Sequence, residues 1–273
     1  MRRLLNLRWT PGGRLALGMV PFVIVILVYL SASAAWHAAD PSEKLLPTPG
    51  DMAQEVQVMA LQVDPQTGAI PLWQDTGASL RRLGIGLAIA TSITLVLGIL
   101  IGVLPLARAA IGPLIGAVAV VPPIAVLPIL FITFGLGETA KIALIVLGVT
   151  PFMVRDLAGH VRAIPEEQLV KAQTLGASTW QIALRVALPQ AMPRLLESAR
   201  LSLGPAWVFL ISAEAIASDV GLGYRVFLVR RYLAMDIILP YVVWIALLAV
   251  SFDFVLSSLS RHAFAWAHPP RTR

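Results

Sequence analysis

The chain has 273 residues, of which 58% are hydrophobic and only 13% are charged, and its mean hydropathy is +0.80. This composition excludes an ordinary soluble globular protein and predicts that lipid is the solvent for most of the chain. The formal net charge is +6, but the basic residues are scattered between apolar runs and form no single stripe, which argues against a nucleic-acid partner. The sequence contains no cysteine, so disulfides, thiolate metal sites and cysteine nucleophiles are excluded.

Six apolar segments approach the length of about 20 residues that a helix needs to cross a bilayer core of about 30 Å. They predict an all-α polytopic membrane protein with spans at residues 15–35, 83–107, 109–134, 142–154, 195–217 and 237–260. The first span follows four arginines, so a cleaved secretory signal is an alternative, but its length favours a retained anchor. The fourth has a short charge-free stretch and spans only if Lys141 and Arg155 snorkel to opposite interfaces.

The positions of lysine and arginine predict the orientation of these spans. If both ends of the chain lie in the cytoplasm, fourteen basic residues fall on the cytoplasmic side and seven on the outer side. Cytoplasmic loops of membrane proteins carry an excess of basic residues, so the count favours this orientation. Arg81 and Arg82, at the outer mouth of the second span, are the exception.

Two connections between the spans are too long to be tight turns. The outer one, 39–74, contains five prolines and is expected to be mostly irregular, with one short helix near residues 51–63. The inner one, 162–194, begins a helix at Pro165, and Gly176 interrupts its helical apolar spacing. We therefore predict two short amphipathic helices that meet at Gly176 and face the cytoplasm. Such an element either binds a cytoplasmic partner or rests on the lipid surface, and composition leaves both open.

The inner connection also carries a motif with a fixed spacing. Gly176 is followed by nine residues and then by Val186-Ala187-Leu188-Pro189. This stretch resembles the coupling loop of ABC importer permeases, written as E-A-A, three residues, Gly, nine residues and I-x-L-P. The opening departs from that pattern, because Val170 and Lys171 stand where the family usually has Glu and Ala.

Further motifs occur in the order seen in the nitrate, sulfonate, taurine and bicarbonate group of these permeases, over about residues 45–266. They are Leu46-Pro47-Thr48-Pro49, Ser79-Leu80-Arg81-Arg82, Pro122-Pro123-Ile124-Ala125-Val126-Leu127-Pro128, Phe134-Gly135-Leu136-Gly137-Glu138, Ala213-Glu214 and Gly221-Leu222-Gly223-Tyr224. The resemblance implies a type I importer permease fold with a cytoplasmic coupling helix. It divides the chain into a cytoplasmic tail with the first span (1–38), an external segment (39–78), a permease core (79–262) containing the coupling loop (163–190), and a cytoplasmic tail (263–273).

The resemblance implies a complete importer in a bacterial inner membrane, with two permease copies, two cytoplasmic ATPase subunits and an external solute-binding protein. This chain has no G-x-x-x-x-G-K-[ST] phosphate loop, so we expect ATP and Mg²⁺ on the partner ATPase, and neither enzymatic activity nor a cofactor or metal in this chain. The implied ATPase-coupling residues are Leu169, Ala172, Thr174, Leu175, Gly176, Ala177 and Ser178. An ordinary helix C-cap is the alternative role for Gly176.

Candidates for the translocation pathway or its gate are Pro122, Pro123, Trp207, Glu214 and Tyr224. The two prolines are expected to kink the third span and to free carbonyl groups. Glu214 lies in an apolar run, where an ionised group is costly, and a structural ion pair or a hydrogen-bonded gate is the alternative to direct solute recognition. Core packing is an equal alternative for Trp207. Asp253, in the sixth span, is expected to cap the inner half of that span or to pair with Arg261.

Two other classes of membrane protein are alternatives to an importer permease. The sequence argues against an intramembrane enzyme, because the four histidines lie at span edges or in tails, and neither H-E-x-x-H nor G-x-S-x-G occurs. A secondary transporter driven by an ion gradient is the alternative, although no inverted repeat is visible. The expected cargo is a small polar solute. Residues 223–244 resemble the branch linked to urea carboxylase, which implies guanidine or urea-like compounds.

Overall fold

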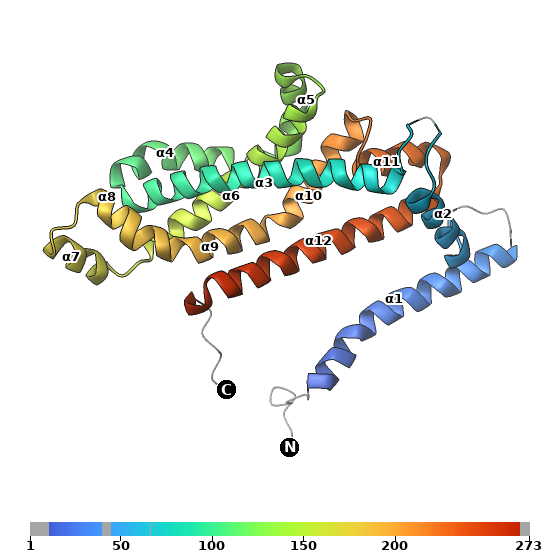
Figure 1. The fold of residues 1–273 in the computed structure, drawn as a ribbon, viewed down its shortest axis with the longest axis horizontal. Helices are drawn as coiled ribbons and strands as arrows, with labels where there is room; N and C mark the ends of the chain where they lie inside the picture. Colours follow the sequence, from blue (N-terminus) through green and yellow to red (C-terminus); the bar gives the residue numbers. More distant parts are fainter. Residues whose placement is uncertain (1–10, 40–44, 66, 268–273) are drawn as a thin grey trace. The chain divides into compact units, whose positions relative to one another are not determined.

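The computed structural model describes residues 11–39, 45–65 and 67–267, and every regular element within these ranges is a helix (Figure 1). The predicted all-α class is confirmed. The helices are α1 (Pro11–Ala39), α2 (Pro49–Leu61), α3 (Pro71–Val103), α4 (Pro105–Val118), α5 (Pro123–Phe134), α6 (Glu138–Arg162), α7 (Glu166–Thr174), α8 (Thr179–Ile182), α9 (Leu188–Leu201), α10 (Leu203–Ile216), α11 (Leu222–Val229) and α12 (Met235–Ala263). A π-helical segment, Ala183–Ala187, joins α8 to α9, and short 3-10 helices follow α11 and α12.

Proline begins five of these helices, from α1 through α5. The N–H of the first helical residue has no hydrogen-bond acceptor within the helix, so proline, which lacks an N–H, loses no bond there. The fixed φ of proline is also close to the helical value. The outer connection is therefore more ordered than predicted. Its short helix is confirmed as α2, but Pro71 opens α3 well before the predicted span start at residue 83. The other end of that span, at 107, was also wrong, because α3 ends at Val103 and Pro105 opens α4.

The chain forms two compact units, residues 1–62 with 229–240 and residues 63–228 with 241–273. In the first unit, α1 exposes its large apolar side chains, including Phe22 at 65%, as expected of a helix whose solvent is lipid. The Tyr29 hydroxyl donates to the Pro47 carbonyl over 2.7 Å, which ties α1 to the segment before α2. α2 then starts with a capping box between Thr48 and Asp51, whose hydrogen bonds lower the pKa of Asp51.

The second unit is built around α3 and α6, which pack in parallel with a fixed register. A Cβ atom added to Gly86 would meet Ile145, one added to Gly98 would meet Leu157, and one added to Gly102 would meet Val161, all at under 3 Å. The residue numbers in each pair differ by 59, so both helices run in the same direction. Between these glycines, Ala90 and Thr94 are fully buried at the same four-residue spacing. This stripe of small residues lets the two backbones approach closely.

The parallel register determines how the chain crosses the membrane between α3 and α6. Since both helices run from the same end of the unit, residues 104–137 must return from the end of α3 to the start of α6. Ile111 and Ile115 of α4 pack near Val154 and Ala158, late in α6, whereas Leu127 and Leu130 of α5 pack near Ala140 and Leu144, early in α6. The α4–α5 pair, bent by 97° at the break before Pro123, is therefore one broken crossing.

A similar argument applies to α9 and α10, which are bent by 43°. Ala191 and Leu195 of α9 pack with Leu157 and Val161 at the late end of α6, and Ala213 of α10 packs with residues at its early end. Four described helices, α1, α3, α6 and α12, are long and apolar enough to cross singly. With the two bent pairs, the described residues contain up to six crossings, in agreement with the prediction.

The charge-free stretch 142–154 of the fourth predicted span lies within α6, a 25-residue helix from Glu138 to Arg162. The expected snorkelling of Lys141 was wrong. Its side chain is 5% exposed, and its ammonium lies 3.4 Å from Glu138. Lys141 is thus held inside the unit by a carboxylate, which removes the need for it to reach an interface.

Candidate functional site

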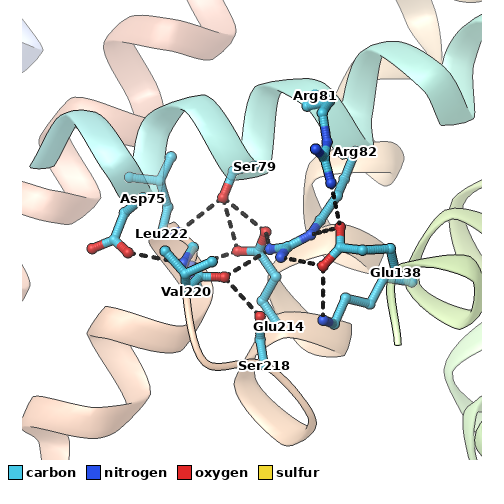
Figure 2. A network of polar contacts seen from close by, with 12 residues as sticks. Asp75, Ser79, Arg81, Arg82, Glu138, Glu214, Ser218, Val220 and Leu222 are labelled. Carbon is cyan, nitrogen blue, oxygen red and sulfur yellow. Dashed lines mark hydrogen bonds and ion pairs between the residues drawn. The ribbon is translucent and has the colours of Figure 1, made fainter. Parts of the chain in front are cut away.

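The described residues contain a buried polar network at the end of the second unit where α3 and α6 begin (Figure 2). Asp75, Ser79 and Arg82 occupy positions i, i+4 and i+7 of α3, which places their side chains on one face of the helix. Opposite them lie Glu138, the first residue of α6, and Glu214, near the end of α10. All but Glu138 are at most 2% exposed.

Glu214 is at the centre of this network and has no exposed surface. Its carboxylate accepts hydrogen bonds from Arg82 Nη1 at 2.6 Å, from Ser79 Oγ at 2.8 Å and from the Gly223 N–H at 2.9 Å. Ser79 in turn accepts from the Leu222 N–H at 2.9 Å. The α10 carboxylate, the α3 side chains and the start of α11 are therefore joined by direct bonds, as Figure 2 shows.

Arg82 connects that centre to α6. Its Nε and Nη2 atoms donate to the two oxygens of Glu138 at 2.7 and 2.6 Å, and Nη1 also donates to the Val220 carbonyl at 2.8 Å. A bidentate pair of this kind is stronger and more directional than a single ionic contact. Arg81 is different, because its side chain is 67% exposed and only reaches Glu138 at 3.5 Å.

A second part of the network surrounds Asp75. One carboxylate oxygen accepts from the Gly221 N–H at 2.9 Å, and the other accepts from Arg225 Nε at 2.8 Å and from the Tyr241 hydroxyl at 3.2 Å. Gly221 has φ of +138°, and a Cβ there would lie 2.6 Å from the Glu214 carboxyl carbon. Only glycine lets the loop before α11 pass this close to the buried carboxylate.

The network is balanced in charge. Its carboxylates are Asp75, Glu138 and Glu214, and its cations, apart from the exposed Arg81, are Arg82, Lys141 and Arg225. Buried charges are tolerated when each has a partner and its remaining donors or acceptors are bonded. This arrangement places Glu214 in a buried ion pair, which is the structural alternative to solute recognition, and both oxygens of its fully buried carboxylate accept hydrogen bonds from the protein.

The remaining pathway candidates are not part of this network. Pro122 and Pro123 lie at the 97° break between α4 and α5, so the kink expected of them is present as a full break in the helix. Trp207 is 4% exposed on α10, and its indole N–H has no hydrogen-bond partner among the described residues. Tyr224 is half-buried on α11. The structure does not bring these four residues together into one site.

The expectation for Asp253 was wrong. Its carboxylate accepts from Arg200 of α9, with Nε at 2.6 Å and Nη2 at 3.1 Å, while Arg261 donates to Ser257 within its own helix. Arg261 lies two turns beyond Asp253 along α12, whereas Arg200 approaches from a neighbouring helix. The pair joins α12 to α9 and is a packing contact of the bundle.

Residues 166–182, for which the sequence predicts a coupling role and which are called the coupling element below, lie at the opposite end of the unit. α7 ends in a Schellman motif, in which the Ala177 N–H donates to the Ala172 carbonyl at 3.0 Å and the Gly176 N–H donates to the Gln173 carbonyl at 2.9 Å. Gly176 has φ of +78°, as this motif requires, and no atom lies within 4 Å of where its Cβ would be. Ser178 then caps α8 through a capping box with Gln181.

Helix continuity after the coupling element differs from the prediction of two short helices. α8, the π-helical segment and α9 run from Thr179 to Leu201 without a sharp bend, so the second amphipathic helix continues into the fifth span. The predicted start of that span at residue 195 was therefore wrong. A proline inside a helix normally removes a backbone hydrogen bond and clashes with the preceding turn. Pro189 is tolerated because it lies in the first turn of α9, directly after the π-helical segment.

The surface of the coupling element carries apolar side chains with no cover within the described chain. Leu175 is 88% exposed, Trp180 is 64% exposed and Val170 is 50% exposed. Leu169, by contrast, packs against the core cluster that contains Val161. Of the predicted coupling residues, Leu169 and Ala172 face inward at least partly, Ala177 is half-buried, and Thr174, Leu175, Gly176 and Ser178 are exposed.

The two regions are separated by about the thickness of a bilayer core. Arg82 and Gly102 lie 20 residues apart on α3, which corresponds to about 30 Å of helix axis. Gly102 packs against Val161, close to where α7 begins. The polar network and the coupling element therefore mark the two ends of a membrane-spanning core.

Known proteins of the same kind match this chain over most of its length. The family described as binding-protein-dependent transport system inner membrane component matches residues 94–264. The chain is 33% identical to the taurine transport system permease protein TauC of Escherichia coli strain K12, over 97% of this chain and 94% of that protein. It is 29% identical to the bicarbonate transport system permease protein CmpB of Synechococcus elongatus, over 89% of this chain and 86% of that protein.

Solved structures agree on the fold. An inward-facing structure of the MetNI methionine ABC transporter superposes with a TM-score of 0.61 at 21% identity, covering 69% of this chain and 94% of that chain. A bacterial ABC transporter that imports the acidic polysaccharide alginate gives a TM-score of 0.60 at 14% identity, covering 91% and 99%. With the membrane-spanning helices described above, these matches confirm the predicted fold, and the chain belongs to the binding-protein-dependent transport system inner membrane component family, the multi-pass permease subunits of ABC importers.

Proposed function

We propose that this permease translocates a small polar solute that an external binding protein delivers, and that two separate cytoplasmic ATPase subunits drive it with ATP and Mg²⁺. The named relatives serve taurine and bicarbonate, which favours a small solute with an anionic group. The observation that carries the proposal is the coupling element. It offers exposed apolar side chains at one end of the bundle, where a cytoplasmic subunit has access to it.

Helix continuity supplies the mechanical link in this proposal. When a partner subunit that is bound to residues 170–180 moves, it moves the continuous helix from Thr179 to Leu201 with it. That helix is bound to α6 through the ion pair between Arg194 and Asp156 and to α12 through the pair between Arg200 and Asp253. Closure of the ATPase pair on ATP would therefore move α9 together with its neighbours, which is the rigid-body motion that alternating access requires.

The proposed orientation places the coupling element in the cytoplasm and the polar network at the outer side. Three of the seven basic residues predicted for the outer side, Arg82, Lys141 and Arg225, form internal ion pairs in the network. The Arg82 exception in the basic-residue count thus has a structural explanation. From the network end, α12 continues past Asp253 toward the coupling end, so a cytoplasmic carboxyl terminus follows from the same orientation.

Gly176→Val is expected to uncouple the importer without unfolding it. A β-branched residue at φ of +78° costs about 1–2 kcal/mol in local strain and distorts the exposed turn that the ATPase would contact. We expect solute uptake and solute-stimulated ATP hydrolysis in reconstituted vesicles to fall by about tenfold, the loss that 1.4 kcal/mol produces.

Gly68→Val is the matched control for this substitution. Gly68 has φ of +66° and equally open surroundings, but it lies in the turn before α3, at the other end of the unit. Both variants carry the same backbone strain, so equal losses of transport would show that the effect is a general one on stability. Normal coupled transport by Gly176→Val would reject the coupling role.

The assembly is expected to contain two copies of this chain and two ATPase subunits. Native mass spectrometry of the co-expressed complex measures that ratio directly. Because the chain has no phosphate-loop motif, the isolated permease is expected to hydrolyse no ATP. A complex with one copy of this chain beside a different permease would reject the homodimer. ATP hydrolysis by the isolated chain would reject the proposal that ATP is hydrolysed only by the separate ATPase subunits.

A further inference from the structure

A cavity of about 590 Å³ lies between the end of the membrane core and the coupling element, which contributes Gln173 and Thr179 to the cavity lining. It lies where α3 turns into α4, beside the last turn of α6 and under α7 and α8, which gather at the same end of α3 in Figure 1. Its volume is in the range of about 300–1,000 Å³ that is typical of ligand pockets.

The polar lining of this cavity is positively charged. Arg108 and Arg162 contribute guanidinium groups, and Gln173 and Thr179 add neutral polar groups. The Arg162 side chain forms no hydrogen bond or ion pair with any described residue, and the cavity lining contains no acidic residue. Arg108 uses Nε and Nη2 to bond the carbonyls of Ile101 and Gly102, which leaves its Nη1 for a ligand. This composition suits an anion with several acceptor oxygens, such as a phosphate group.

A second, apolar hollow opens next to the charged one. Its volume is about 140 Å³, and it shares Val103, Leu104 and Thr179 with the larger cavity. Its other walls are Ile99, Leu100, Trp180 and Ala183, so it is lined by hydrocarbon and one exposed indole. A charged pocket that shares walls with a smaller apolar hollow, called the apolar slot below, suits a lipid headgroup beside an acyl chain at the end of a membrane-spanning helix.

We propose that this composite site binds an anionic phospholipid, with its phosphate against Arg108 and Arg162 and one acyl chain in the slot beside Trp180. Basic pockets between transmembrane helices at the cytoplasmic surface are known to hold acidic lipid headgroups. The apolar slot distinguishes a lipid from a free phosphate, which would make no use of it. The site touches both the end of α3 and the start of α8, so a bound lipid would brace the coupling element against the core.

The test is a lipid titration of the full-length permease, purified in detergent and followed by native mass spectrometry. Dioctanoyl phosphatidylglycerol is expected to bind, and dioctanoyl phosphatidylcholine to bind at least tenfold more weakly, because its headgroup has no net negative charge. Arg162→Gln is expected to weaken phosphatidylglycerol binding roughly fivefold, and the double variant with Arg108→Gln roughly 25-fold, since each basic residue near a membrane surface contributes about this factor.

Two controls keep the interpretation specific. Arg155→Gln removes an exposed charge from the same helix that lines neither hollow, and it is expected to leave binding unchanged. Arg162→Lys keeps the charge and is expected to retain most of the binding, which separates charge from folding. Glycerophosphoglycerol, which has the headgroup without acyl chains, is expected to bind far more weakly than the lipid.

Three results would overturn the proposal. Equal binding of phosphatidylcholine would show that the headgroup charge is not recognised. Equal binding of glycerophosphoglycerol or of inorganic phosphate would show an anion site without a lipid. Unchanged binding in the double arginine variant would place the lipid elsewhere. None of these depends on ATPase coupling, so the proposed function stands or falls separately.

Discussion

Arg82→Ala is expected to lower the unfolding temperature of the detergent-solubilised permease by roughly 6–20 °C. The substitution leaves the fully buried Glu214 without its cation and removes the bidentate bonds to Glu138. Removal of one partner from a buried ion pair destabilises a protein by about 3–5 kcal/mol, and each kcal/mol corresponds to about 2–4 °C in a chain of this size. Intrinsic tryptophan fluorescence on heating measures the shift.

Arg81→Ala is the control for this experiment. Its side chain occupies the next position on α3 and carries the same charge, but it is 67% exposed and only 3.5 Å from Glu138 at its closest. Exposed pairs contribute at most about 1 kcal/mol, so this variant is expected to unfold within a few degrees of the wild type. Similar shifts for both arginines would show that the buried network is not a stabilising unit.

Gly98→Leu is expected to destabilise the α3–α6 pair by about 3 kcal/mol, at the upper end of the cost of overpacking a core. A Cβ at this position would lie 2.7–3.0 Å from three side-chain atoms of Leu157, before any larger side chain is added. If α3 and α6 moved apart to accommodate the leucine, they would also lose the close contacts that the small residues on both sides of Gly98 allow. Thermal unfolding in detergent and the yield of folded protein after solubilisation measure the effect.

Gly84→Leu tests the same substitution in the same helix at a position with nothing within 4 Å of the added Cβ. It is expected to be neutral or slightly stabilising, because leucine has a higher helix propensity than glycine. A second check uses Gly98→Ala, whose destabilisation is expected to be partly relieved by Leu157→Ala, since the three atoms nearest to the added Cβ all belong to the Leu157 side chain. If Gly84→Leu and Gly98→Leu unfold alike, the close register between α3 and α6 is not what holds the core.

Proline is the clearest example of what sequence reasoning predicted and what it missed. Pro122 and Pro123 were expected to interrupt the third span, and the chain does break there. Pro71 was counted as a marker of irregular chain, although the same residue type begins five helices here. A proline disfavours helix before it and permits helix after it, so a local pattern does not tell an irregular segment from the first turn of a long helix. The long apolar segment that follows Pro71, up to Val103, is the feature that indicates a helix starting at this proline.

The buried network shows a different limit. Ser79, Arg82, Glu138 and Glu214 all lie within the motifs that resemble the permease family, but the sequence predicts a functional role only for Glu214. Sequence separation hid the rest, because Arg82 and Glu214 are 132 positions apart and their pairing depends on the packing of three helices. The sequence does contain one usable indication, which is the number of charged residues in or beside the apolar segments. Three carboxylates and three cations at span ends need partners, and the simplest hypothesis is that they pair with one another.

The coupling element was predictable because its information is local. The turn at Gly176 follows from a residue that adopts positive φ at low cost, and the capping box of Ser178 and Gln181 spans four residues. The continuation into α9 is not predicted, because the expected fifth span starts only at residue 195 and the second amphipathic helix is treated as a separate, short element. The expected pairing of Asp253 with Arg261 was wrong because it relied on closeness in the sequence, whereas the actual partner, Arg200, is distant in the sequence and close in space.

The constant register between α3 and α6 also restricts how the gene can change in length. One inserted residue turns the rest of a helix by about 100°, so an insertion between residues 86 and 102 would carry every later small residue of α3 away from α6. The same holds for an insertion between 145 and 161. Natural length variants of this chain should therefore carry their insertions and deletions in the stretch before residue 71, in 104–137, or after 162, where the register of the two helices is untouched.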